Sequence, residues 1–264
     1  MTASGVLLGA INSRSPNDTS QLLQSSLKKY NEMPKAQRLR KDMPSETQEH
    51  MEDRHPKDGL ALRQYSRDLP RPDGRKPAEQ WQQKAWNTDT IWFMADEMRQ
   101  WLPPGTVAKG QLHEVPAALV RRLGRFAFID NVRGQTNSFE DANIEKGTIA
   151  IEVAGVKDGI VTLKMTGEAR AVRRGRWAVG GHEDTQQREQ ERGYDLKLAG
   201  RATFDSKKNR FTTFDLVAVG ERWGGTQYNR RDRELEKAPI GYVLTLAAEG
   251  DTTAPSEVYN YGWR

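Results

Sequence analysis

Apolar residues alternate with polar ones through most of the second half of the chain. This period of two is typical of β-strands with one buried face. It occurs in six segments: residues 125–129, 148–153, 160–165, 194–204, 211–219 and 240–246. Polar or glycine-containing stretches at residues 155–159 and 205–209 separate neighbouring segments and indicate hairpins. We therefore expect an α+β protein whose antiparallel β domain covers residues 125–264, built as a sandwich, a half-barrel or a curved meander.

The N-terminal part shows the helical period instead. Leu23 and Leu27 lie four positions apart between Pro16, which suits the first turn of a helix, and Pro34, which ends one. Residues 15–33 are therefore predicted to form a short amphipathic helix. Its apolar stripe is narrow, so the helix has to pack on something to be stable.

A polar stretch follows this helix at residues 34–80, and residues 35–54 are nearly all charged, Gln, Ser or Pro. Such a composition buries too little apolar surface to fold alone. The stretch is predicted to be either a disordered linker or an extended arm that becomes ordered on another chain. Residues 1–76 are thus expected to form a polar arm with a short helix, partly extended or disordered.

Four of the seven tryptophans fall within residues 77–102, at spacings that predict a helix ended by two prolines. A second short helix is predicted at residues 116–123. Residues 77–124 are expected to form a Trp-rich helical segment. Trp92 and Trp101 are expected to be buried against the β domain, with a cofactor-stacking helix or an exposed docking face as the alternatives.

The stretch at residues 173–193 is predicted to be a long polar insertion between two strands. Loops of this length are uncommon unless they are functional or disordered. It holds His182, Glu183 and Asp184, whose imidazole and carboxylates are candidates for holding a divalent ion or moving a proton. A solvated loop is the alternative, and no metal, cofactor or catalytic residue is assigned.

The most individual stretch lies at residues 220–231, directly after a predicted strand. Two adjacent glycines allow close approach of a ligand or of another backbone. Trp, Tyr and Arg are enriched at binding hot spots. The candidate binding residues are Arg222, Trp223, Tyr228, Arg230 and Arg231. The same side chains suit a packed corner over the open end of a β core, so both interpretations stay open.

Composition limits the possible functions. Lys and Arg exceed Asp and Glu by 41 to 36, a net charge of +5. Nucleic-acid binding needs clustered positive charge, which this balance does not favour. The absence of cysteine excludes disulfides, thiol catalysis and iron–sulfur clusters. The sequence also contains none of the GxSxG, GxGxxG or P-loop patterns.

No stretch reaches the roughly 18 consecutive apolar residues of a membrane-spanning helix. Residues 1–10 lack the basic region of a secretion signal. We therefore expect a soluble protein of undetermined compartment. Export or a cell-envelope location applies if the chain begins at a mature or truncated N-terminus.

Two stretches of the predicted β domain resemble a known group of proteins. Residues 214–224, Phe-Asp-Leu-Val-Ala-Val-Gly-Glu-Arg-Trp-Gly, are followed by Ala-Pro-Ile-Gly at residues 238–241. Together with residues 128–134 they are similar to uncharacterised proteins of planctomycete-type bacteria. The resemblance covers about residues 100–250 and implies no activity and no catalytic residues.

These features favour a non-catalytic subunit of a larger protein assembly that docks through its N-terminal arm and Trp-rich helix. The first alternative is a hydrolase or a carbohydrate-active or carbohydrate-binding module that uses carboxylates and surface tryptophans. A nucleic-acid binder comes third. A cleft with paired carboxylates would favour the enzyme, and exposed clustering of Arg222, Arg230 and Arg231 would favour nucleic acid.

Overall fold

The computed structural model describes residue 2 and residues 6–11, 15–38, 51–180 and 186–262. The chain divides into two compact units, Met1–Glu49 and His50–Arg264, which are described separately. The candidate metal donors His182, Glu183 and Asp184 lie outside the described residues, as does most of the polar stretch at residues 35–54.

The first unit contains the predicted amphipathic helix. Helix α1 (Pro16–Glu32) begins after Ser15, whose hydroxyl accepts a hydrogen bond from the Asp18 amide. A short helix α2 (Lys35–Arg38) follows it. None of the residues of α1 is buried, and Leu23 and Leu27 are exposed by 61% and 52%.

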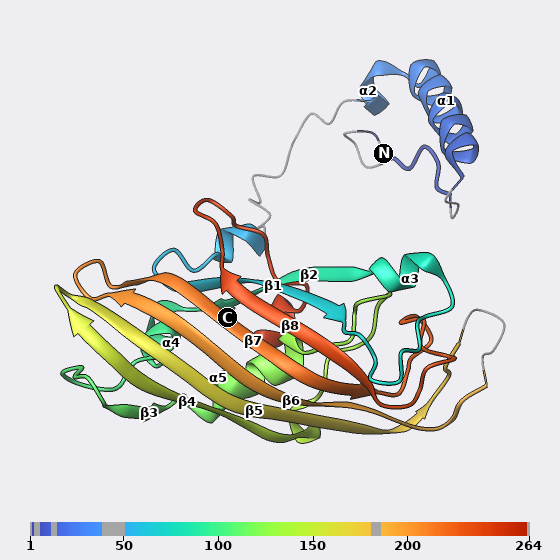
Figure 1. Cartoon of the computed structure of the whole chain (residues 1–264). Coiled ribbons are helices and arrows are strands. Elements are labelled where there is room, and N and C mark those ends of the chain that lie inside the picture. Colours follow the sequence, from blue (N-terminus) through green and yellow to red (C-terminus); the bar gives the residue numbers. More distant parts are fainter. Residues whose placement is uncertain (1, 3–5, 12–14, 39–50, 181–185, 263–264) are drawn as a thin grey trace. The chain divides into compact units, whose positions relative to one another are not determined.

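The second unit is built on one open sheet of eight strands in the order β2-β1-β8-β7-β6-β5-β4-β3, with all neighbours antiparallel. The expected α+β class with an antiparallel β domain is confirmed. The strands are β1 (Leu60–Asp68), β2 (Trp86–Phe93), β3 (Leu112–Glu114), β4 (Ile144–Lys157), β5 (Ile160–Trp177), β6 (Arg188–Asp205), β7 (Arg210–Trp223) and β8 (Ala238–Leu246). Figure 1 shows the long strands β4 to β8 running side by side as a meander.

The predicted hairpins form where the turn residues allow them. Asp158 and Gly159 both have positive φ, 55° and 88°, which is the conformation of a tight two-residue hairpin turn. At the next turn the Asp205 carboxylate accepts hydrogen bonds from the Lys207 and Lys208 amides, at 3.0 and 3.1 Å. These local contacts explain why the sequence pattern located these strands well.

Helices cover one face of the sheet, called the inner face below. They are α4 (Ala95–Arg99), α5 (Ala117–Arg122) and the π-helical turn η2 (Leu123–Ala127). Figure 1 shows α4 and α5 lying behind the strands. The core between these helices and the sheet includes Trp101, Leu119, Tyr194, Phe214 and Tyr242. The smaller elements are α3 (Gln80–Lys84), η1 (Met51–Arg54), η3 (Asp141–Asn143) and η4 (Val258–Tyr261).

The helix predicted over residues 77–102 is wrong in its middle, where β2 runs between α3 and α4. The period-two pairing of β2 with β1 overrides the helical spacing of the tryptophans. Trp92 and Trp101 are fully buried, but in different places. Trp101 contacts Phe93 and Phe214 edge-on in the inner core, with ring centroids 5.5 and 5.3 Å away. Trp92 contacts the ring of His55, 5.2 Å away.

The boundary of the polar arm also needs correction, because β1 belongs to the sheet. Leu60 and Leu62 enter the core, and β1 pairs with both β2 and β8. Residues 60–68 are therefore ordered by their own chain. The sequence hid this strand because its partners are distant and because the two inner positions after Leu62 are polar, Gln64 and Ser66.

Two further predictions in the β domain are wrong. Residues 125–129 do not form a strand, because α5 continues into η2, where the Tyr194 hydroxyl donates to the Gly124 carbonyl at 2.7 Å. Most of the insertion predicted at residues 173–193 is strand, since β5 extends to Trp177 and β6 begins at Arg188. Among the described residues, no helix is long and apolar enough to cross a membrane.

Candidate functional site

The stretch at residues 220–231 lies in a network of charges at one end of the sheet. We call it the arginine–carboxylate cluster, and it consists of Asp68, Asp130, Arg133, Arg222, Arg231 and Glu234. Asp68 ends β1, Asp130 and Arg133 follow η2, and Arg222 is near the end of β7. Arg231 and Glu234 come from the connection between β7 and β8. The cluster therefore joins segments that are far apart in the sequence.

Arg231 is the centre of this cluster. Its Nε and Nη2 donate to the two carboxylate oxygens of Asp130, at 2.8 and 2.7 Å. Its Nη1 and Nη2 donate to the two oxygens of Asp68, at 3.0 and 2.7 Å. The side chain is fully buried. These two bidentate pairs on one guanidinium hold the end of β1, the segment after η2 and the connection between β7 and β8 in a defined geometry.

Two more arginines of the cluster, and one from outside it, also contact the carboxylates. Arg133 donates to Asp68 at 2.8 Å and to Glu234 at 2.9 Å. Arg222 donates to the Glu234 backbone carbonyl and, at 3.2 Å, to its carboxylate. Arg71 reaches the same carboxylate from outside, at 3.0 Å. Each carboxylate of the cluster thus contacts at least two arginines.

The electrostatics of the cluster suit a structural clamp. Burial would raise the pKa of Asp130, but Arg231, Arg222 and Arg133 outweigh it and hold this pKa below its usual value. The pKa of Glu234 is lowered in the same way, chiefly by Arg133. Burial lowers the pKa of the Arg222 guanidinium. A general acid needs a raised carboxyl pKa, so these groups are arranged to hold arginines and not to donate protons.

The five candidate binding residues do not form one surface. Arg222 and Arg231 are buried in the cluster, whereas Tyr228 and Arg230 are exposed. Trp223 is 9% exposed, and its ring has the cationic groups of Arg170 and Lys237 each 5.3 Å from its centroid. Its indole nitrogen donates to Glu191 at 2.9 Å. Arg222 and Arg231 are therefore buried, as the packed-corner alternative expects, whereas Trp223 lies among charged side chains and does not cover the apolar core.

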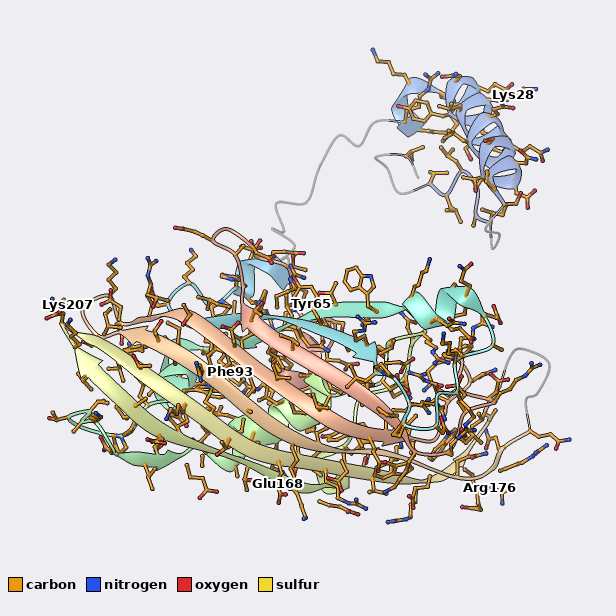
Figure 2. The ribbon with its side chains drawn as sticks, viewed as in Figure 1. Lys28, Tyr65, Phe93, Glu168, Arg176 and Lys207 are labelled. Atoms are coloured by element: carbon orange, nitrogen blue, oxygen red, sulfur yellow. The ribbon has the colours of Figure 1, made fainter. Side chains whose placement is uncertain are left out.

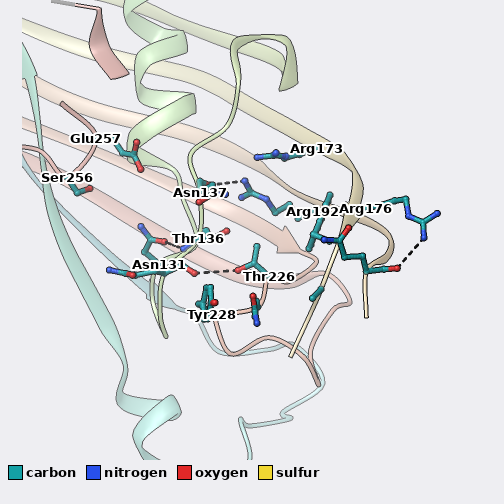
Figure 3. Close-up of a pocket in the computed structure, with 15 residues that line it drawn as sticks. Asn131, Thr136, Asn137, Arg173, Arg176, Arg192, Thr226, Tyr228, Ser256 and Glu257 are labelled. Carbon is teal, nitrogen blue, oxygen red and sulfur yellow. Dashed lines mark hydrogen bonds between the residues drawn. The ribbon is translucent and has the colours of Figure 1, made fainter. Parts of the chain in front are cut away.

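A pocket of about 880 Å³ lies beside Tyr228, and we call it the polar pocket. Figure 3 shows Arg173, Arg176 and Arg192 among the residues around it. Its other lining residues are Asn131, Gln135, Thr136, Asn137, Trp177, Ala178, Gln187, Thr226, Gln227, Tyr228, Ser256 and Glu257. Sequence reasoning missed Arg192. Arg192 lies an even number of positions before Tyr194, Leu196 and Leu198, which face the core, and this spacing could have indicated that Arg192 also points inward.

The opposite, solvent-exposed face of the sheet carries an apolar stripe. It consists of Trp86, Tyr65, Val243, Val217 and Val219, which are exposed by 61, 42, 37, 40 and 43%. Strand register makes it continuous, because Val243 pairs with both Tyr65 and Val217. The rings of Tyr65 and Trp86 lie 6.2 Å apart.

Charges cover the same face of the sheet on β4 to β6. Glu168 accepts from Lys197 at 2.6 Å and lies 3.6 Å from Lys146. Arg170 bridges Glu145 and Asp195 at 2.8 and 2.7 Å. Figure 2 labels Tyr65 on the apolar stripe and Glu168 on the charged part. The solvent-exposed face is therefore charged on β4 to β6 and apolar along the stripe.

No group of three or more His, Asp or Glu residues suited to a metal ion occurs in the described part of the chain. Comparison with known proteins found no matching family model, no matching curated protein and no matching solved structure.

Proposed function

We propose that this protein is a non-catalytic interaction subunit that docks on another protein chain through the apolar stripe. The observation that carries this proposal is the contrast on the solvent-exposed face, where ion pairs on β4 to β6 give way to Trp86, Tyr65 and three valines. Contiguous exposed apolar surface on a folded protein is characteristic of interaction sites.

The composition and rigidity of the stripe support this role. Trp and Tyr supply large contact areas with few rotatable bonds and are enriched at hot spots. The stripe crosses four hydrogen-bonded strands, β2, β1, β8 and β7. Little side-chain and backbone entropy is therefore lost when a partner binds.

Charge narrows the chemistry of the partner. Arg67 is exposed, and its strand neighbours are Trp86 on β2 and Gly241 on β8. Within the described ranges, no carboxylate lies at ion-pair distance from Arg67; its Nε donates only to the Asp68 carbonyl, at 3.4 Å. A fitting partner surface is apolar with a carboxylate opposite Arg67.

The N-terminal arm remains part of the proposal as a second contact with the same partner. Helix α1 carries Leu23 and Leu27 on its surface and buries no residue of its own. In place of the predicted Trp-rich helix, Trp86 of β2 is proposed to contact the partner, because Trp92 and Trp101 are buried.

A hydrolase and a nucleic-acid binder draw less support from the geometry. A hydrolase would use paired carboxylates, but those of Asp68, Asp130 and Glu234 are taken up by arginines. A nucleic-acid binder would use an exposed group of arginines, whereas Arg222 and Arg231 are buried. Of the five candidates, Tyr228 and Arg230 retain accessible side chains for binding.

The docking proposal is tested by comparing lysine substitutions in the apolar stripe with lysine substitutions in the charged part of the same face. Partners retained by the tagged full-length chain are identified, and their affinities are measured for Val217→Lys and Val243→Lys. Thr148→Lys and Thr166→Lys are the matched controls, because both threonines are exposed on the charged part of the same face. We expect Kd to rise at least about tenfold for the valine variants, typical of the loss of a hot spot, and to stay unchanged for the threonine variants.

Two results would contradict the proposal. One is equal partner affinity for all four variants. The other is a wild-type chain that retains no partner but forms dimers that Val217→Lys disrupts, because the stripe would then bind a second copy. Thermal unfolding of each variant checks that the fold is preserved.

A further inference from the structure

Two arginines face each other at the polar end of the inner face of the sheet. Arg173 on β5 and Arg192 on β6 are directly paired in the strand register. Both continue the inward-facing positions of their strands, after Ala169 and Ala171 on β5 and before Tyr194 on β6. Like charges placed directly opposite each other destabilise a sheet. The pairing therefore needs an explanation.

Arg192 differs from the other buried arginines. The described part of the chain buries four arginines, Arg133, Arg192, Arg222 and Arg231. The other three each contact carboxylates of the arginine–carboxylate cluster. Arg192 is 6% exposed, and no described carboxylate lies at ion-pair distance from it.

The contacts of Arg192 orient its guanidinium without neutralising it. Nη2 donates to the carbonyls of Asn137 and Ser138 at 2.8 and 3.3 Å, and the group lies 4.3 Å from the centroid of the Phe139 ring. Figure 3 shows the bond to Asn137 with Arg173 nearby. Burial, and then Arg173, lower the pKa of Arg192 to about 10, with a smaller opposing effect from Asp130. A positive charge is thus held in place at the edge of a pocket.

The rest of the polar pocket suits a hydroxylated ligand. Its lining includes six amide or hydroxyl side chains from residues 131–137 and 226–227 and one acid, Glu257. Trp177 is fixed in the wall by an indole hydrogen bond to the Gly225 carbonyl at 2.8 Å, and Tyr228 supplies a second aromatic side chain. Its volume of about 880 Å³ is much larger than a single ion needs.

We infer that the polar pocket binds an acidic sugar, with the carboxylate or sulfate group of the sugar held between Arg192 and Arg173. Forked guanidinium donors match the geometry of such oxyanions. The amides bind the sugar hydroxyls, and the aromatic side chains cover the apolar face of the ring. This site is independent of the apolar stripe and goes beyond the docking role proposed above.

The test uses the full chain and defined probes. Calorimetry and thermal unfolding are run with sodium glucuronate against glucose, and with sodium sulfate against sodium chloride at equal ionic strength. Glucuronate and sulfate are expected to bind and to raise Tm, whereas glucose and chloride are not. Arg192→Gln and Arg173→Gln are expected to weaken glucuronate binding at least tenfold. Arg201→Gln is the matched control, because Arg201 is an exposed arginine of the same strand β6.

Arg173→Gln keeps the test informative if Arg192→Gln fails to fold, because Arg173 is half-buried and, among the described residues, its one ion-pair partner is the exposed Glu140, at 3.7 Å. Three results would overturn the inference: no binding of glucuronate, glucose binding as tight as glucuronate binding, or equal glucuronate affinity for wild type and Arg173→Gln. None of them bears on partner docking by the apolar stripe.

Discussion

Arg231 forms a bidentate ion pair with Asp130, with its Nε and Nη2 donating to the two carboxylate oxygens at 2.8 and 2.7 Å. This pair ties the connection between β7 and β8 to the segment that follows η2. Residues 220–231 therefore contain both buried and exposed side chains. The inward arginines hold the fold together, while Tyr228 and Arg230 remain accessible.

The clamp role of Arg231 predicts a large loss of stability when it is removed. Arg231→Met leaves the carboxylates of Asp130 and Asp68 without their central partner, and breaking a buried pair costs about 3–5 kcal/mol. Arg230→Met removes the neighbouring exposed arginine and should change the free energy of unfolding by about 0.5 kcal/mol or less. Urea denaturation measures both. Equal losses for the two variants would show that the clamp contributes little.

The lowered pKa values of Asp130 and Glu234 predict how the clamp depends on pH. A carboxyl whose folded pKa is lowered stabilises the protein above the unfolded pKa, here about 3.8 and 4.5, and this stabilisation is lost as the pH falls through the folded pKa. The stability difference between wild type and Arg231→Met should therefore be largest at neutral pH and shrink in acid. Denaturation across a pH series checks this. A constant difference would contradict the electrostatic explanation.

Replacing tryptophan with alanine should change the free energy of unfolding very differently at the buried Trp101 and at the exposed Trp86. Trp101→Ala opens a cavity between Phe93 and Phe214 and should cost about 3–5 kcal/mol. Trp86→Ala removes an exposed side chain and should cost less than about 1 kcal/mol. Guanidinium denaturation followed by circular dichroism compares the two. A small effect at Trp101 would mean that the turn after α4 packs loosely on the sheet.

Local sequence patterns located the strands that are joined by short turns. The hairpins at residues 155–159 and 205–209 carry their own turn chemistry, so period-two alternation was sufficient there. Strands β1 and β2 escaped prediction because they pair with each other across 17 residues and join the sheet through β8. Such non-local pairing leaves little trace in a short window of sequence.

The site was harder to predict because arginine is usually exposed. Arg222 and Arg192 continue the inward phase of β7 and β6, and this phase was the one signal that they are buried. Their partners differ, since Arg222 contacts the carboxylate of Glu234 and Arg192 contacts backbone carbonyls. That difference depends on which loops meet at the end of the sheet, and the sequence does not show this.

Hydroxyl-radical footprinting of the full chain, alone and bound to its protein partner, tests the docking proposal most directly. Labelling of Tyr65 and Trp86 should fall sharply in the complex, because the partner covers the apolar stripe. Tyr259, which is 78% exposed and lies on η4, should label equally in both states. Unchanged labelling of Tyr65 and Trp86 in a saturated complex would contradict the proposal that this protein docks through that face.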